Sequence, residues 1–286
     1  MAIVFANGIE IYYEITGKGQ PLTLIMGLGC SARQWQWMVP VFAESFQVIT
    51  FDNRGVGRSG KPDMDYTTEL FADDICALLD ALHVEKTHIF GVSVGGMIAQ
   101  RFALKYSGRV DRLVLGCTMP NFNYLPPASK DIETMAESQQ LSIEEGVEKM
   151  MSLFLTPQFK SSHPDQTAQL KEVMLLETME RGMVAFLNQL GAAMIHKTQE
   201  EVKQIAAPTL LVCGDKDPMA PVANSRFLAE QIPDSTLIEL PGGYHAFWVE
   251  RYEEACRIIK AFLLSDAGFY RFSISESRRQ ADYLCL

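Results

Sequence analysis

Three polar residues in separate loops of this chain have the chemistry of a nucleophilic serine site. Ser93 lies within GVSVG (91–95), where an apolar run passes directly into a helical pattern, and Asp217 and His245 follow in GDKDPMAP and PGGYHAFWVE. A serine hydroxyl is a weak nucleophile near neutral pH. It needs a histidine to take its proton and a carboxylate to orient that histidine. The residue types therefore predict acyl transfer through a serine.

The glycines around Ser93 indicate a sharp turn. Such a turn holds a hydroxyl clear of the main-chain hydrogen bonds, and residues two positions away must then have almost no side chain. The Val94 amide would begin the helix, where free N–H groups stabilise negative charge. The alternative is that the glycines only pack a strand-to-helix connection and Ser93 caps the helix. The acid and histidine downstream favour the catalytic interpretation.

Strand and helix patterns alternate around these loops. Strands are expected at 9–15, 22–26, 46–51, 87–90, 112–117, 209–213 and 236–240, and helices at 67–82, 95–106, 223–232 and 250–264. The first strand alternates in polarity, whereas the later ones are mostly continuous and β-branched, as strands covered on both faces should be. The pattern predicts an α/β fold with a mostly parallel sheet, flanked by helices, and an antiparallel start. Ser93, Asp217 and His245 each follow a strand, at the edge where such sheets carry their sites.

One segment interrupts the alternation. Residues 119–204 contain helical patterns such as SIEEGVEKMMSLF and KEVMLLETMERGMVAFLNQL without a convincing strand. We expect a helical cap there, inserted into a core formed by 1–118 and 205–264. Eight of the 14 methionines fall in this segment, either as a pliable apolar lid or as ordinary helix packing. The tail 265–286 fits no periodic element, and we interpret it as an appendage or an extension added for expression.

Composition restricts the partners. The formal net charge of −10 argues against nucleic acids and anionic membranes. The start, MAIVFANGIE, has no visible signal peptide, and no apolar run approaches the ~18 residues of a membrane span. Six scattered cysteines without a CxxC pair indicate reduced thiols, and we expect a cytoplasmic protein. A homo-oligomer is compatible with the sequence.

Two other features resemble binding motifs but have structural explanations. GVGRSG (55–60) matches a dinucleotide-binding spacing, but the next helix begins only near Thr67, so we interpret it as a turn tied structurally by Asp52 and Arg54. The remaining histidines have no ligand spacing, and we expect no metal. His196 lies in the cap, where a surface position is expected. These histidines are His83, His88, His163 and His196.

The order of these elements resembles the α/β-hydrolase superfamily over roughly residues 1–264. GVSVG looks like its nucleophile elbow, FDNRGVGRSG (51–60) is similar to the loop after its fourth strand, and SVGGMIAQ looks like the elbow helix of enol-lactone hydrolases and cofactor-free haloperoxidases. The resemblance implies the α/β-hydrolase fold with a cap after the sixth strand. It also selects Asp217 over Asp215, because the family acid stands before the proline that opens the next helix.

The resemblance also implies an oxyanion hole. The family's second oxyanion amide comes from the loop after the third strand, which here reads Met26-Gly27-Leu28-Gly29, with Met26 in place of the usual histidine. Leu28 is then one amide donor and Val94 the other. Gly27 and Trp248 are expected to contact the substrate.

These residues lead to an expected reaction. It is hydrolysis of a carboxylic ester or lactone of a small, largely apolar substrate, through an acyl-enzyme on Ser93 and without a cofactor. The alternatives are carbon–carbon bond hydrolysis, perhydrolysis as in cofactor-free haloperoxidases, or a slow-turnover ligand sensor on the same scaffold. A serine at the elbow argues against dehalogenase and epoxide hydrolase chemistry, which uses an aspartate.

Overall fold

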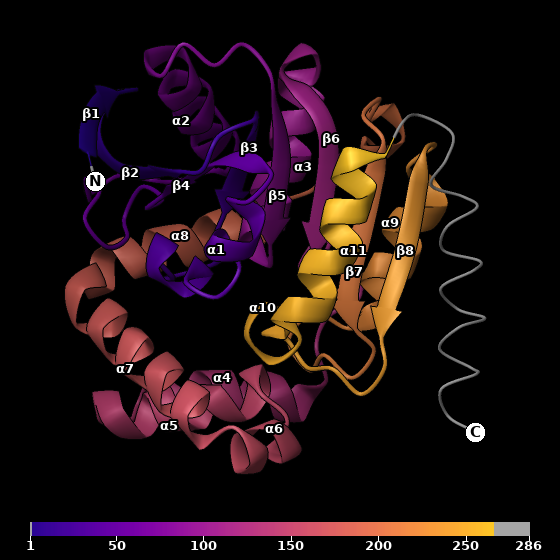
Figure 1. The fold of residues 1–286 in the computed structure, drawn as a ribbon. Coiled ribbons are helices and arrows are strands. Elements are labelled where there is room, and N and C mark those ends of the chain that lie inside the picture. Colours follow the sequence, from indigo (N-terminus) through magenta and orange to yellow (C-terminus); the bar gives the residue numbers. More distant parts are fainter. Residues whose placement is uncertain (1, 266–286) are drawn as a thin grey trace, which may run out of the picture.

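One sheet organises the protein. The computed structural model describes residues 2–265, and the tail predicted from 265 onward therefore lies outside it apart from Ser265. Across the sheet the strand order is β1-β2-β4-β3-β5-β6-β7-β8 (Figure 1). The strands are β1 (Ala2–Ala6), β2 (Ile9–Thr16), β3 (Gln20–Ile25), β4 (Phe46–Phe51), β5 (Thr87–Val92), β6 (Val110–Gly116), β7 (Thr209–Gly214) and β8 (Ser235–Leu240).

Strand direction agrees with the sequence pattern. The pairs β1–β2 and β2–β4 are antiparallel, and every other pair in the described sheet is parallel. All residues of β5 and β7 are buried, as their continuous apolar runs require. The predicted mostly parallel sheet with an antiparallel start is confirmed.

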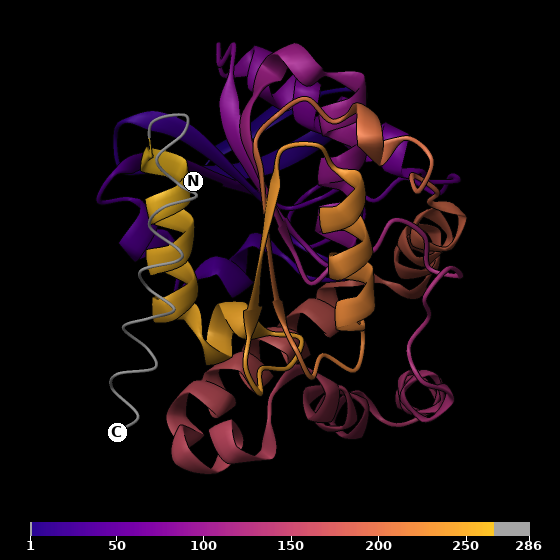
Figure 2. The same ribbon diagram turned by 90° about the vertical axis from the view of Figure 1, so that its right-hand side faces the viewer.

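Helices cover both faces of the sheet. On one face, α1 (Val39–Phe42) contacts α11 (Tyr252–Leu264), which packs on β7 and follows α10 (Phe247–Glu250). On the other face lie α2 (Thr68–Ala81) and α3 (Val94–Lys105), packed together, and α9 (Val222–Gln231) against β7 and β8. Figure 2 shows α11 and α9 on opposite sides of the strands. Of the helices between residues 2 and 265, none has the length and apolar character that a bilayer crossing requires.

The segment between β6 and β7 is helical. Its elements are α4 (Ser129–Ser138), α5 (Ile143–Phe154), α6 (Pro157–Ser162), α7 (Pro164–Arg181) and α8 (Met183–Ile195). Its described part contains one β contact, an isolated bridge between Asn121 and Lys197. Figure 1 shows α4 to α7 gathered beyond one end of the sheet. We refer to residues 119–204 as the cap segment.

Two local features differ from the sequence analysis. The pattern over 171–190 suggested continuous helix, but Gly182, with φ of 73°, separates α7 from α8. Strand β1 was not expected. It joins β2 through Asn7 and Gly8, both with positive φ, which is the Asn-Gly signature of a tight hairpin.

His196 also differs from expectation, because it is buried rather than at the surface. Its Nδ1 lies 2.9 Å from the Thr68 hydroxyl of α2, and its Nε2 lies 3.2 Å from the Thr198 hydroxyl. Burial lowers the pKa of His196 to about 3, so the ring is neutral. It joins the end of the cap segment to the core.

Buried polar contacts hold the cap segment against the loop after β3. Glu177 of α7 accepts hydrogen bonds from the Ser31 N–H at 2.6 Å, the Ser31 hydroxyl at 2.7 Å and Gln34 Nε2 at 2.7 Å. Gln189 of α8 accepts from the Gly29 N–H at 2.9 Å and donates to the Arg54 carbonyl at 2.6 Å. Two cap helices are thereby connected to core loops by fully buried groups.

The Glu177 carboxyl is unusual because its pKa is raised to about 7, mainly by burial, despite the hydrogen bonds that oppose this rise. Gln34 Oε1 is buried and accepts no hydrogen bond from the described residues. Turning the Gln34 amide by 180° would present this oxygen to a protonated Glu177. The site can therefore hold a neutral carboxyl.

A Glu177→Gln substitution should make stability less dependent on pH. Because the pKa is higher in the folded chain, wild-type stability is unaffected below about pH 4.5 and decreases as pH rises to about 7, by on the order of 3 kcal/mol. The measurement is urea unfolding at pH 5 and pH 8. The free energy of unfolding of the variant, relative to that of the wild type, should be larger at pH 8 than at pH 5. Glu180→Gln, on the same helix, is the matched control. An equal difference between wild type and Glu177→Gln at both pH values would contradict the expectation.

Candidate active site

Ser93 occupies a strained turn between β5 and α3. Its φ of 56° and ψ of −124° are rare for a residue with a side chain. The Ser93 N–H donates to the Gly116 carbonyl at 2.9 Å, while its carbonyl accepts from the Gly96 N–H at 2.9 Å and the Thr118 hydroxyl at 2.7 Å. These bonds occupy the main chain of Ser93 and hold the turn in place.

Glycines are required on both sides of this turn. A Cβ at Gly91 would lie 2.2 Å from the Gly95 carbonyl oxygen, and one at Gly95 would lie 2.2 Å from that of Ile25. A Cβ at Gly96 would lie 2.5 Å from the Thr118 Cβ. All three distances are shorter than any contact a real Cβ makes. The glycines therefore let α3 approach the sheet, as the sequence predicted.

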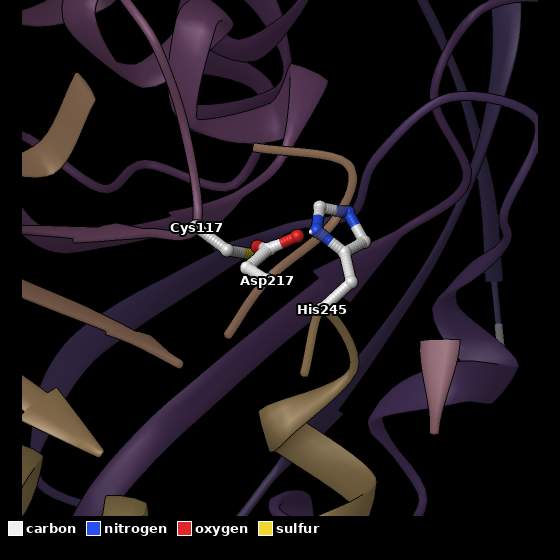
Figure 3. A group of neighbouring side chains, drawn as sticks. All are labelled: Cys117, Asp217 and His245. Carbon is white, nitrogen blue, oxygen red and sulfur yellow. Dashed lines mark hydrogen bonds and ion pairs between the residues drawn. The ribbon is translucent and has the colours of Figure 1, made fainter. Parts of the chain in front are cut away.

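Asp217 and His245 meet although they follow different strands. His245 Nδ1 lies 2.8 Å from Asp217 Oδ2, and both residues are buried (Figure 3). The other carboxylate oxygen of Asp217 accepts from the N–H groups of Met219 and Ala220, at 2.8 and 2.9 Å. Three hydrogen bonds thus hold the Asp217 carboxyl group against the ring, and they leave Nε2 of His245 without a bond to Asp217.

Aromatic rings surround the His245 side chain. The centroids of the Phe154 and Trp248 rings lie 5.5 and 5.7 Å from that of the imidazole. The Ala246 N–H also donates to the Phe154 carbonyl at 2.9 Å. The cap residue Phe154 therefore contacts the histidine loop through both its ring and its main chain. These rings shield the Asp217–His245 hydrogen bond from water.

The Cys117 side chain also lies beside Asp217 and His245. Its Sγ, an Asp217 oxygen and a His245 nitrogen lie within 4.8 Å of one another (Figure 3). Burial, with a further contribution from Asp217, raises the pKa of the Cys117 thiol well above its usual range. A protonated thiol is a poor metal ligand, and Asp217 already binds the histidine nitrogen. The group is therefore better suited to hydrogen bonding than to metal coordination.

A cavity of about 220 Å³ adjoins Ser93 and His245. Both residues line it, as do three other residues predicted to act at the site, Gly27, Leu28 and Trp248. Its remaining wall is largely apolar and comes mostly from the cap segment. The apolar cap residues are Leu141, Ile143, Val147, Met150, Phe154, Met174, Met183 and Phe186.

Two main-chain amides stand near the serine. Val94, the residue after Ser93, is the first residue of α3, and the first N–H groups of a helix have no partner within it. None of the described residues accepts a hydrogen bond from the Leu28 amide. A Cβ at Gly27, the residue before Leu28, would lie 3.0 Å from that of Ser93. The loop after β3 therefore runs against the serine.

The other polar residues that the sequence analysis considered form hydrogen bonds and ion pairs that join core loops. Asp215 accepts from the Gly242 N–H at 2.7 Å and joins two loops, away from His245. Asp52 accepts from the N–H groups of Ala32 and Arg58, both at 2.9 Å, and Arg54 pairs with a buried Asp74 at 2.6 Å. GVGRSG is a turn between β4 and α2.

Sequence reasoning missed Glu177 and Arg181, which also line the cavity. They lie four residues apart on α7, in a segment recognised only as helical. Their spacing places them on one face of a helix. Nothing in the sequence indicated that this face points to the site.

The model of the α/β hydrolase fold family matches residues 20–252. The chain belongs to the α/β-hydrolase family. Residues 20–252 span the sheet from β3 onward, the whole cap segment and the three loops that carry Ser93, Asp217 and His245.

Relatives of this α/β-hydrolase are named for different hydrolytic reactions. It is 31% identical over 284 residues to the "Putative carbamate hydrolase RutD" of Yersinia enterocolitica, covering 96% of this chain and all of that protein. It is 24% identical to 3-oxoadipate enol-lactonase 2 of Acinetobacter baylyi, covering 81% of this chain and 85% of that one. The crystal structure of an enol-lactonase from Burkholderia xenovorans superposes with a TM-score of 0.82, at 22% identity, over 92% of this chain and all of that one. Family and relatives support hydrolysis as the general reaction.

The glycine requirement at the elbow can be measured. Gly95→Ala should lower the free energy of unfolding by about 3 kcal/mol or more, because its Cβ would overlap a main-chain oxygen that cannot move freely. Gly191→Ala, in the interior of α8 with nothing within 4 Å, should instead stabilise by roughly 0.5–1 kcal/mol. Urea unfolding midpoints of the two variants give the comparison. Similar stability for both would show that the turn tolerates a side chain.

Proposed function

We propose that this α/β-hydrolase is a serine hydrolase that cleaves a carboxylic ester or lactone of a small, largely apolar substrate. The observation that carries the proposal is the 2.8 Å hydrogen bond between Asp217 and His245, beside a cavity that Ser93 also lines. In this proposal, residues 119–204 form a separate cap domain that covers the site. The apolar wall favours an apolar acyl or alcohol group.

The first half of the reaction acylates the serine. His245 Nε2 takes the proton of Ser93 as Oγ bonds to the substrate carbonyl carbon, and the carbonyl π electrons move to oxygen. Collapse of this intermediate breaks the carbon–oxygen bond of the ester, and His245 gives its proton to the leaving alkoxide. Asp217 stays ionised and stabilises the protonated ring.

The second half releases the acid. His245 takes a proton from water, the hydroxide adds to the acyl carbon, and the bond to Ser93 Oγ breaks as that oxygen regains its proton. In both halves the amides of Leu28 and Val94 bind the oxyanion. An amide that a protein already holds in place can lower such a barrier by about 2.7–4 kcal/mol.

A carbamate is the second candidate substrate. The relative with 31% identity over 96% of this chain is named as a carbamate hydrolase. A carbamate carbonyl would accept Ser93 Oγ in the same way, although the leaving group and the second product differ. A substrate panel containing esters, lactones and a carbamate separates the candidates by their kcat/KM values.

Ser93→Ala should abolish esterase activity. We expect kcat on short p-nitrophenyl esters to decrease by on the order of 10⁴-fold or more, because the acyl-enzyme cannot form. Ser138→Ala is the matched control, since Ser138 lines the same cavity, and its hydroxyl donates to the Met135 carbonyl at 2.6 Å and accepts from Gln139 Nε2 at 3.1 Å. The control should retain activity within a few-fold. Equal turnover by wild type and Ser93→Ala would remove the assignment.

Asp217→Asn should lower kcat by about 10³–10⁴-fold with little change in KM, because a neutral amide cannot stabilise the protonated His245. Asp215→Asn, two residues away in the same loop, changes a carboxylate that binds only the Gly242 amide and should have a small effect. Steady-state kinetics of both variants at pH 7.5 test this. A similar loss in the two variants would mean that loop integrity, rather than the Asp217 charge, is responsible.

A further inference from the structure

We propose that Arg181 binds an anionic group of the substrate, and that the substrate carries a free carboxylate in addition to the acyl group attacked by Ser93. This inference rests on the proposed function, since it names the substrate class of the same site. Arg181 is the last residue of α7 and lines the cavity together with Ser93 and His245.

The Arg181 guanidinium has few partners for a group with five N–H donors. Its Nη2 donates to Gln139 Oε1 at 3.4 Å, and its Cζ lies 3.8 Å from the centroid of the Phe186 ring. No carboxylate oxygen of the described residues lies within 4.0 Å of it. Arg33, by contrast, forms an ion pair with Glu180 at 2.7 Å, and Glu180 is the residue that precedes Arg181 in the chain. Most N–H groups of Arg181 therefore remain available to a ligand.

Glu177, one turn earlier on α7, offsets this charge only in part. Its oxygens are occupied by Ser31 and Gln34. Its pKa is raised to about 7, chiefly by burial, so near neutral pH it is ionised only in part. A partly buried cation without a partner is destabilising. A bound anion would supply the missing charge and bidentate hydrogen bonds.

The loop after β3 relates Arg181 to the serine. A Cβ at Gly27 would lie 3.0 Å from that of Ser93, and a Cβ at Gly29 would lie 3.0 Å from Nη1 of Arg181. Two residues of extended chain span at most about 7 Å. These contacts together place the Ser93 Cβ no more than about 16 Å from Arg181 Nη1. A small molecule with its carbonyl at Ser93 and an anion at its far end can span such a distance.

The surroundings favour a carboxylate over a phosphate. Arg181 is the one Lys or Arg among the described residues that line this cavity. A dianion would exceed its single positive charge, whereas a singly charged planar carboxylate balances that charge and matches the guanidinium fork. The residues that line the cavity also include the apolar Leu28 and Phe186. The expected class is a half-ester of an aliphatic dicarboxylic acid, or a lactone bearing a carboxylate side chain.

The test compares monomethyl adipate with dimethyl adipate at pH 7.5, because the two differ only in the charge and one methyl group of the distal carboxyl. Wild type should favour the monoester at least tenfold in kcat/KM. Arg181→Gln should reduce this ratio at least tenfold, mainly through KM of the monoester. Arg33→Gln removes a neighbouring guanidinium outside the cavity lining and should keep the ratio within about threefold.

Calorimetry of adipate binding gives a readout that needs no turnover. The dissociation constant should rise at least tenfold in Arg181→Gln and stay near the wild-type value in Arg33→Gln. Equal binding by wild type and Arg181→Gln, or equal use of the two esters by wild type, would overturn the inference. Arg181-dependent adipate binding without cleavage of either ester would support the anion site and overturn the esterase proposal.

Discussion

At the turn around Ser93, stretches of main chain approach so closely that a hydrogen atom is the largest side chain that fits. Gly91 of β5 lies against Gly95 of α3, and Gly95 lies against the end of β3. This contact fixes how α3 enters the sheet and holds Ser93 in a conformation that it would not adopt alone. The positions of the Ser93 side chain, of the N-terminus of α3 and of the loop after β3 all depend on this contact.

Burial gives the second half of the site its properties. The Asp217 carboxylate, surrounded by two amide donors and His245, is stabilised without contact with bulk water. The Cys117 thiol beside it remains protonated, because burial and the carboxylate both raise its pKa. The Cys117 thiol therefore adds no negative charge beside the imidazole. The charge of Asp217 therefore acts mainly on His245, within a low-dielectric pocket where it is most effective.

The core and the three polar residues could be predicted because local chemistry specifies them. GVSVG has glycines where a strand-to-helix turn needs them, and each parallel strand ends in a loop with a recognisable polar residue. The register follows, with Ile25 beside Gly91 and Val92 beside Gly116, so the loops meet at one edge. The hairpin at Asn7-Gly8 carried an equally local signal that the sequence analysis passed over.

The cap segment could not be predicted beyond its helical content. Helical periodicity shows which residues share a face, but not which core loop that face meets. Glu177 therefore reads as an ordinary charged residue, although Ser31, from a distant part of the chain, buries it. His196 was misplaced for the same reason, because its partner Thr68 lies 128 positions away. The position of Arg181 beside Gly29 likewise comes from tertiary packing that no spacing in the sequence reveals.

The hydrogen bonds from Glu177 and Gln189 to the loop after β3 have a consequence for admission to the cavity. Lifting α7 or α8 to admit a bulky molecule would break several buried bonds at once and leave the Gly29 and Ser31 amides unpaired. Each such unpaired group costs about 1–3 kcal/mol. Compact molecules that enter without moving these helices avoid the penalty. The hydrogen bonds of Glu177 and Gln189 would therefore disfavour the binding of any molecule whose entry requires α7 or α8 to move.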